Sequence, residues 1–301
     1  MEHSHQHPTP NKYTLAFGVG TALNIGFVIV EAVFGFLSNS LALIADAGHN
    51  LGDVLALLLS WGATYLAQQK PTRTKTYGLR RGTILAAFIS SLILLMTMSI
   101  VAWEALGRFA SPSEVNSMTI MIVAAIGVLI NTATALLFFS SKNDDLNIKA
   151  AFIHMAADAG VSLGVVLAGI AIMITGFLWI DPAISLLIVV VIVFSTWSVF
   201  QDSFNLAMDG VPKGIDVEEV RNFILQQDGI TEIHDLHIWA MSTTQVALTA
   251  HLVRDTTTID DQFLHRLSRE LCNKFKIIHP TIQIESGKQA HLCDQAHHDS
   301  V

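Results

Sequence analysis

The sequence predicts an α-helical membrane protein with six transmembrane helices, followed by a small C-terminal α+β domain. Three observations support this fold class. The 301-residue chain is 51% hydrophobic and 14% charged, with a mean hydropathy of +0.51, which is too apolar for a soluble protein of this size. Its apolar residues gather in six long stretches in the first two thirds of the chain. The last third is polar and alternates between helix and strand patterns.

Each apolar stretch is long enough to cross about 30 Å of hydrocarbon at ~1.5 Å per residue. The stretches cover residues 13–36, 40–67, 80–107, 116–140, 147–176 and 181–205. The first begins too late and runs too long for a cleaved signal peptide, so we expect it to remain as a span. Asp181 followed by Pro182 is typical of a helix start and marks the beginning of the sixth span.

Basic residues are divided unevenly between the two sides of the predicted membrane. One side carries Lys12, Lys70, Arg73, Lys75, Arg80, Arg81, Lys142 and Lys149. The other side carries little except Arg108. By the positive-inside rule, both termini and the loops after the second and fourth spans are cytoplasmic. We therefore expect a multi-pass protein of the cell (inner) membrane.

The C-terminal pattern predicts a two-layer α+β domain, and both chain ends are polar. The expected regions are a flexible arm at 1–12, the six-helix domain at 13–208, the α+β domain at 209–288, and a flexible tail at 289–301. Within the α+β domain we expect helices at 216–227 and 260–275, and strands at 230–239, 245–253 and 281–285. Histidines in the arm and histidines with Cys293 in the tail are candidates for metal capture, against the simpler interpretation of solvated ends.

Two residue pairs inside the apolar stretches have the same spacing. His49 and Asp53 lie in the second stretch, and His154 and Asp158 lie in the fifth. A spacing of four residues places both members of a pair on one helix face, so two such helices would present two imidazoles and two carboxylates to one point. Ionisable groups in a membrane are costly, and the repeated pair argues against a simple hydrogen bond between helices. Nitrogen and oxygen donors in equal number favour tetrahedral zinc or a neighbouring divalent ion.

Two further acidic residues in the spans have open interpretations. Asp46 lies one turn before His49, where it either holds that ring as a hydrogen-bond acceptor or ends the helix at a vestibule. Glu31 in the first span either lines the ion route or is solvated near the outer end.

The α+β domain contains a second group of candidate ligands. They are His234, His237, His251, His265, His279 and Glu285. His234 and His251 lie on strands expected to pair across a hairpin, so we expect these two histidines and Glu285 to be the cytoplasmic metal ligands. Cys272 and Cys293 both fall on the cytoplasmic side, which disfavours a disulfide. No organic cofactor and no nucleic-acid partner are expected.

The ordered motifs resemble the cation diffusion facilitators, a family of zinc-exporting secondary transporters. The similarity rests on Ser40 to Asp53 in the second span, Phe152 to Asp158 in the fifth, Asp181-Pro182, Asp209-Gly-Val-Pro212, His234 to Trp239, Ala250-His-Leu252 and Thr281 to Glu285. The resemblance covers nearly the whole chain. One departure is Thr83, which stands where members often carry an acidic residue.

This resemblance implies six spans with cytoplasmic ends, a ferredoxin-like tail domain and a homodimer. It also implies that His49, Asp53, His154 and Asp158 form the transport site, and that two His with two Asp mark zinc-type members. The short loop between the fourth and fifth spans lacks the His-rich insertion of many vesicular eukaryotic members, which favours a bacterial-type exporter.

The expected function is secondary-active efflux of zinc, with cobalt, cadmium or iron as further candidates, in exchange for protons. A metal-bound imidazole must be neutral, so protons and Zn2+ compete for the same ligands. The chain has no Walker-type phosphate loop for ATP. Two other functions also use His and Asp ligands in or near a membrane. An intramembrane metallohydrolase usually needs a His-Glu-x-x-His motif, which is absent, and a membrane-tethered metal sensor does not need paired ligands in two spans.

Overall fold

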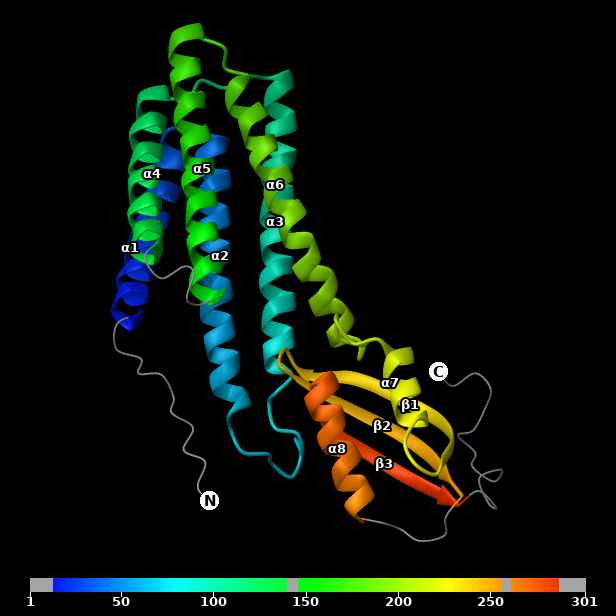
Figure 1. Cartoon of the computed structure of the whole chain (residues 1–301). Helices are drawn as coiled ribbons and strands as arrows, with labels where there is room; N and C mark the ends of the chain where they lie inside the picture. The colour runs from blue at the N-terminus through cyan, green and yellow to red at the C-terminus, as the bar shows by residue number, and fades with distance from the viewer. Residues whose placement is uncertain (1–12, 140–145, 256–260, 287–301) are drawn as a thin grey trace. The chain divides into compact units, whose positions relative to one another are not determined.

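The computed structural model describes residues 13–139, 146–255 and 261–286 (Figure 1). The predicted arm at 1–12 and tail at 289–301 lie outside the described residues. The described chain forms two compact units. The first contains residues up to Leu57 together with Ser91–Trp197, and the second contains Leu58–Ser90 together with the chain from Ser198 onward.

Six long helices coincide with the six predicted spans. They are α1 (Tyr13–Leu37), α2 (Leu41–Ala67), α3 (Gly82–Ala110), α4 (Ser117–Phe139), α5 (Leu146–Thr175) and α6 (Ile180–Ala207). By length and composition, α2 to α6 each contain a segment that can cross a membrane. The described part of α1 adds a shorter apolar segment, Ala22–Leu37.

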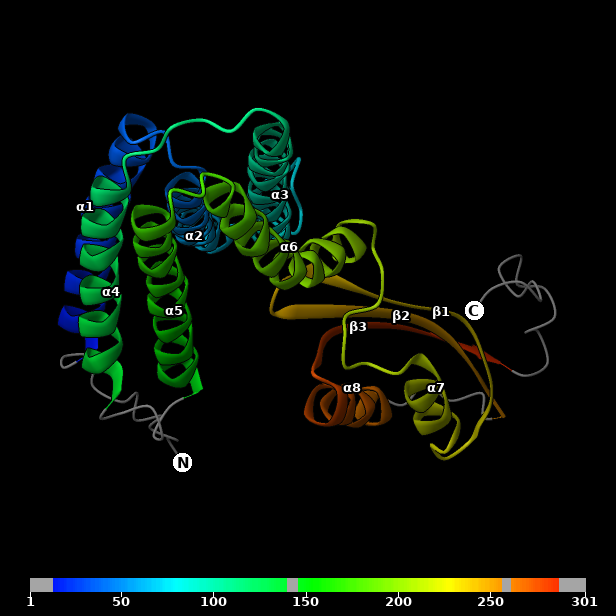
Figure 2. The same cartoon turned by 90° about the horizontal axis from the view of Figure 1, so that it is seen from above.

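Within the first unit, α5 lies beside α4 and α4 lies beside α1 (Figures 1 and 2). A glycine permits this close approach: a Cβ on Gly127 of α4 would come within 2.7 Å of the Phe27 ring on α1 and 3.0 Å of Ser162 Oγ on α5. The unit's core contains small and branched residues such as Ala42, Val165 and Ile120. Large apolar side chains on the outer helix faces, including Trp103 and Phe194, are exposed, as expected for surfaces that contact lipid.

The N-terminal end of α2 is held by a carboxylate from α6. Asp181 is buried, and its oxygens accept hydrogen bonds from Ser40 Oγ (2.6 Å) and from the backbone amide of Leu41 (2.8 Å). The Arg108 guanidinium lies beside this carboxylate, with Nη1 3.9 Å from Asp181 Oδ2, and it donates to Asn39 O (2.6 Å). Asp181 therefore starts α6, as predicted, and also satisfies the free amides of α2.

The α+β domain contains α7 (Val217–Leu225), β1 (Ile230–Ser242), β2 (Gln245–Arg254), α8 (Asp261–Phe275) and β3 (Ile277–Ser286). The sheet order is β1-β2-β3, with β1 antiparallel and β3 parallel to β2. Both helices cover one face of the sheet (Figure 2). Alternate residues of β2, including Leu248, Ala250 and Leu252, are buried in the core on that face. The intervening residues, His251 among them, therefore lie on the opposite face.

Every predicted element of the domain is present, with changes at its ends. The Asp216 carboxylate caps α7 by accepting from the backbone amides of Glu218 (2.9 Å) and Glu219 (3.3 Å). β1 runs through Ser242, three residues beyond the predicted end of that strand at 239, and leaves only two residues for the turn before β2. β3 starts at Ile277 instead of residue 281, because Lys276 adopts a left-handed conformation (φ 61°) that ends α8 directly before the strand.

Candidate metal centres

The two His and Asp pairs of α2 and α5 meet in the first unit. His49 Nε2 lies 3.6 Å from Asp53 Oδ2 and 3.5 Å from Asp158 Oδ1. His154 Nε2 lies 3.2 Å from Asp53 Oδ2 and 3.6 Å from Asp158 Oδ2. Each histidine therefore contacts one carboxylate on its own helix and one on the other helix. The structure brings together all four residues that the sequence singled out.

These separations match the dimensions of a tetrahedral zinc site. Four ligand atoms at bond lengths of about 2.0–2.1 Å from one zinc ion lie about 3.3 Å apart, and the four measured nitrogen to oxygen distances run from 3.2 to 3.6 Å. Ligand atoms of Asp53, His154 and Asp158 all lie within 4.8 Å of one another. His49 lies outside that set: it contacts both carboxylates, but its ring centroid is 6.1 Å from that of His154. The nitrogen to oxygen distances therefore suit a divalent ion at this group.

Exposure differs sharply across this group. The side chains of Asp158 and His49 are 3% and 15% exposed, whereas those of Asp53 and His154 are 31% and 43% exposed. Asp53 follows His49 along α2, and His154 precedes Asp158 along α5. In the predicted topology, the end of α2 at residue 67 and the start of α5 at residue 146 lie on the same side of the membrane. The two exposed ligands therefore share one side of the group. The site therefore opens toward that side.

The structure answers the questions about Asp46 and Glu31. The carboxylate of Asp46 accepts a hydrogen bond from Ser162 Oγ (2.9 Å) and lies near Asn50 Nδ2 (3.5 Å). His49 Nδ1 is buried without a hydrogen-bond partner, so Asp46 does not hold that ring. Glu31 is fully buried and accepts from Asn50 Nδ2 (3.2 Å), so the interpretation of Glu31 as a solvated residue is wrong.

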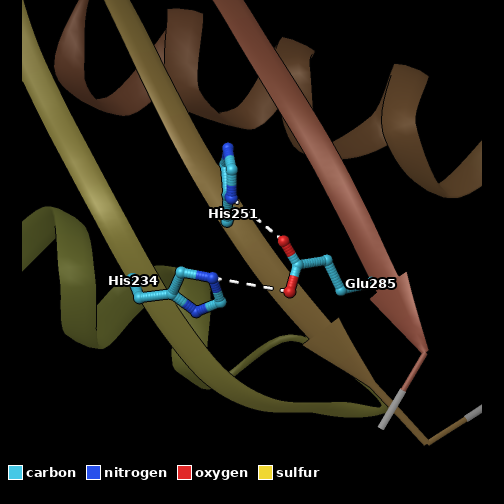
Figure 3. Close-up of side chains that lie close together, drawn as sticks. All are labelled: His234, His251 and Glu285. Carbon is cyan, nitrogen blue, oxygen red and sulfur yellow. Dashed lines mark ion pairs between the residues drawn. The ribbon is translucent and has the colours of Figure 1, made fainter. Parts of the chain in front are cut away.

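A second group lies on the sheet face opposite the helices (Figure 3). His234 on β1 pairs directly with His251 on β2, and Glu285 reaches toward both from β3. His251 Nδ1 is 2.9 Å from Glu285 Oε1, and His234 Nε2 is 3.4 Å from Glu285 Oε2. Their ligand atoms lie within 4.8 Å of one another. Both ring nitrogens of His234 and Oε2 of Glu285 are buried and have no hydrogen-bond partner in the described part of the chain, which leaves these donor atoms available to a metal.

Sequence reasoning missed Asp235, which joins this sheet-face group. Its carboxylate lies 3.7 Å from His251 Nε2 and 3.0 Å from His237 Nε2. Simple strand alternation would place residues 234 and 235 on opposite faces. The strand is irregular between His234 and His237, and Asp235 has a left-handed backbone (φ 52°), which turns its side chain to the histidine face. Only the His-Asp-Leu-His run hinted at this role.

The other candidate ligands of the domain lie elsewhere. His265 is exposed on α8, and His279 contacts Tyr77 ring to ring at 5.6 Å. Cys272 is a free thiol on α8. The histidines of the arm, and Cys293 with its neighbouring histidines, lie outside the described residues.

Comparison with known proteins identifies the chain. The family described as "Cation efflux transmembrane domain" matches residues 18–206, and "Cation efflux protein, cytoplasmic domain" matches residues 212–287. This chain belongs to the cation efflux family. The predicted family and fold class are confirmed: a helical membrane domain precedes a cytoplasmic domain built on a small β-sheet.

Several curated cation efflux proteins resemble the chain over almost its whole length. The metal cation efflux system protein CzcD of Cupriavidus metallidurans is 36% identical, over 98% of this chain and 92% of the relative. The cadmium, cobalt and zinc/H(+)-K(+) antiporter of Bacillus subtilis is 35% identical, over 98% and 95%. The zinc transporter ZitB of Escherichia coli is 34% identical, over 97% and 96%.

Among solved structures, the metal-bound C-terminal domain of the Cupriavidus metallidurans CzcD transporter is 42% identical. The match covers 24% of this chain and 99% of the solved domain, with a TM-score of 0.22. Members of the cation efflux family are cation transporters and not enzymes, which excludes the intramembrane metallohydrolase. This chain is accordingly a membrane-spanning metal cation efflux protein.

Proposed function

We propose that this transporter exports zinc from the cytoplasm in exchange for protons, and that four ligands from α2 and α5 hold the ion during transport. The proposed ligands are His49, Asp53, His154 and Asp158. The observation that carries the proposal is the set of nitrogen to oxygen distances among them, 3.2–3.6 Å, which lie close to the edge of a zinc tetrahedron. The membrane-tethered sensor, the remaining alternative, does not explain why two membrane helices supply this arrangement.

The ligand set supports zinc as the main substrate. Two imidazoles and two carboxylates suit zinc and neighbouring divalent ions, whereas manganese and magnesium prefer oxygen ligands alone. The relatives support the same group of metals, because their names include zinc, cadmium and cobalt. We propose cobalt, cadmium and iron as secondary substrates, since ligand type orders metal affinities without excluding neighbours.

The exposure of the ligands supports export from the cytoplasm. With both termini cytoplasmic in the inner membrane, the end of α2 near residue 67 and the start of α5 face the cytoplasm. The exposed ligands Asp53 and His154 lie toward that side, and the buried Asp158 lies on the outer side. Zinc therefore enters from the cytoplasm in the conformation described here. Movement of the helices then opens the outer side, where protons displace zinc.

Proton coupling is tested with the purified protein in sealed vesicles that contain a zinc-sensitive dye. We expect an imposed pH gradient to drive zinc across the membrane even when no zinc gradient is present, because protons compete with zinc for the ligands. An ionophore that collapses the pH gradient serves as the control and should abolish this flux. Zinc flux that does not depend on the pH gradient would contradict proton exchange. An absence of zinc flux would contradict zinc transport.

We propose that the sheet-face group of His234, His251 and Glu285 binds regulatory zinc. His234 and Glu285 offer buried donor atoms that have no hydrogen-bond partner among the described residues, and His251 lies beside them on the same face of the sheet. Zinc bound there would stabilise a homodimer formed through the cytoplasmic and membrane parts and favour one transport state.

His251→Ala tests this regulatory role. We expect the variant to bind about one zinc ion fewer per chain and to lose the zinc-dependent increase in dimer affinity, because His251 supplies a ligand atom 2.9 Å from Glu285. Zinc binding is measured by equilibrium dialysis and dimer affinity by analytical ultracentrifugation. His265→Ala is the matched control, since this histidine is exposed on α8 away from the group. Unchanged zinc stoichiometry and dimer affinity in His251→Ala would contradict the proposed regulatory site.

A further inference from the structure

Two buried carboxyl groups of the membrane domain have no part in the proposed metal site. Glu31 on α1 and Asp46 on α2 are both 0% exposed. One amide nitrogen brings them together, because Asn50 Nδ2 lies 3.2 Å from Glu31 Oε2 and 3.5 Å from Asp46 Oδ1. Two buried carboxylates this close together repel each other, so we expect one of them to carry a proton.

The hydrogen-bond partners indicate which residue carries that proton. Asp46 accepts from Ser162 Oγ on α5 (2.9 Å) and is also approached by Asn50 Nδ2 (3.5 Å), so both of its oxygens face donors. Glu31 accepts from Asn50 through Oε2 alone (3.2 Å), and its Oε1 is buried without any donor in the described chain. Asp46 is therefore the better solvated carboxylate, and Glu31 is the acid.

The surroundings of the pair suit a proton and exclude a metal ion. The amide nitrogen of Asn50 points hydrogen atoms at both carboxyls, and such donors repel a metal cation. Packing next to the pair is tight, because a Cβ on Gly127 would come within 3.0 Å of Ser162 Oγ. A proton needs no cavity.

Position connects the pair to the metal ligands. Asp46 precedes His49 on α2 by about one helical turn, and Ser162 follows Asp158 on α5 by about one turn. Both steps lead away from the exposed ligands Asp53 and His154. The pair therefore lies beyond the buried side of the metal site, which is the side from which protons enter in the proposed exchange.

The charged groups nearest to the pair belong to the metal site. His49 follows Asp46 by three residues on α2, and Asp158 precedes Ser162, the donor to Asp46, by four residues on α5. α4 carries no charged residue, and Glu31 is the only charged residue of α1. The charged residues of α3 and α6 are Glu104, Arg108, Asp181 and Asp202, which pair with one another or with Lys213. His49 and Asp158 are therefore the proposed metal ligands that lie nearest to the pair.

We propose that Glu31 and Asp46 form a proton-binding site distinct from the four metal ligands, and that the proton they share is released when zinc binds. Zinc adds two positive charges beside Asp158 and His49, which disfavours the proton on Glu31 and stabilises both carboxylates. The two amide hydrogens of Asn50 remain to serve both carboxylates after the proton leaves. By reciprocity, a proton on Glu31 weakens zinc binding, which aids release of zinc to the outside. This inference rests on the proposed zinc and proton exchange.

Glu31→Gln tests the inference by counting protons. Zinc binding to the whole purified protein is measured by calorimetry in buffers of different ionisation enthalpy, which gives the number of protons released per zinc. We expect Glu31→Gln to release about one proton fewer than the wild type, because glutamine keeps the shape of the acid and has no proton to lose. Glu104→Gln is the matched control, since this exposed glutamate pairs with Arg108, and it should release the wild-type number.

A second measurement reads the carboxyl group directly. In infrared difference spectra, zinc should remove the carbonyl band of one protonated carboxyl from the wild type. Asp46→Asn should lack that change, because Glu31 then has no neighbouring carboxylate with which to share a proton. A wild-type spectrum without the loss, or equal proton counts in the wild type and Glu31→Gln, would overturn the inference. A wild type that binds zinc without releasing protons would instead contradict the proposed exchange.

Discussion

Asp158→Ala is expected to lower zinc transport in sealed vesicles by at least about 100-fold. Asp158 is the most buried of the four proposed ligands, and its two oxygens contact a histidine on each helix, at 3.5 Å and 3.6 Å. Loss of a group that only supports a metal ligand already costs about 10-fold to 100-fold in affinity, so loss of a direct ligand should cost at least as much. The substitution also leaves both imidazoles without this carboxylate, which removes the geometry that matches a tetrahedral ion.

The same assay distinguishes loss of the site from loss of the protein. His49→Ala should reproduce the defect, because it removes the other buried ligand. Asp202→Ala is the matched control: its carboxylate is partly exposed and pairs with Lys213, and such pairs contribute little. We expect this control to transport zinc at the wild-type rate. Normal zinc uptake by Asp158→Ala or by His49→Ala would show that the transport site lies elsewhere.

Asp181→Ala is expected to destabilise the membrane domain by about 2–4 kcal/mol. The buried carboxylate accepts from Ser40 Oγ and from the Leu41 amide, and both donors would be left buried without a partner. Each unsatisfied buried donor costs about 1–3 kcal/mol. Arg108 would also lose its buried anionic neighbour. The measurement is the thermal unfolding midpoint of the purified protein in detergent, which should fall by several degrees.

A neighbouring carboxylate provides the control for this effect. Glu104 pairs with the same Arg108 at 3.2 Å, but its side chain is 56% exposed. Glu104→Ala should therefore lower stability by no more than about 1 kcal/mol. An Asp181→Ala protein as stable as the Glu104→Ala protein would show that the N-terminal end of α2 does not depend on this cap.

Much of the architecture could be predicted because its signals are local. Hydrophobic length alone located the six helices, since a backbone in lipid must satisfy its hydrogen bonds within a helix. Strand patterns located the sheet and the pairing of the two strands that carry His234 and His251, whereas the register that sets these two residues opposite each other came from the structure. Element ends were less predictable. The start of β3 depends on the left-handed conformation of Lys276, which no periodic pattern reports.

The sequence by itself determined the fold class, the family and the pairing of His and Asp on one helix face, because a repeat of four residues fixes side-chain direction within a helix. Only the tertiary structure decided which helices meet, and it thereby set the distances of 3.2–3.6 Å among the four proposed ligands. It also decided the surroundings of isolated polar residues. A bulge turned Asp235 toward His251, and burial between helices placed Glu31 beside Asp46. Contacts between residues distant in the chain leave no periodic trace, so they become visible only after folding.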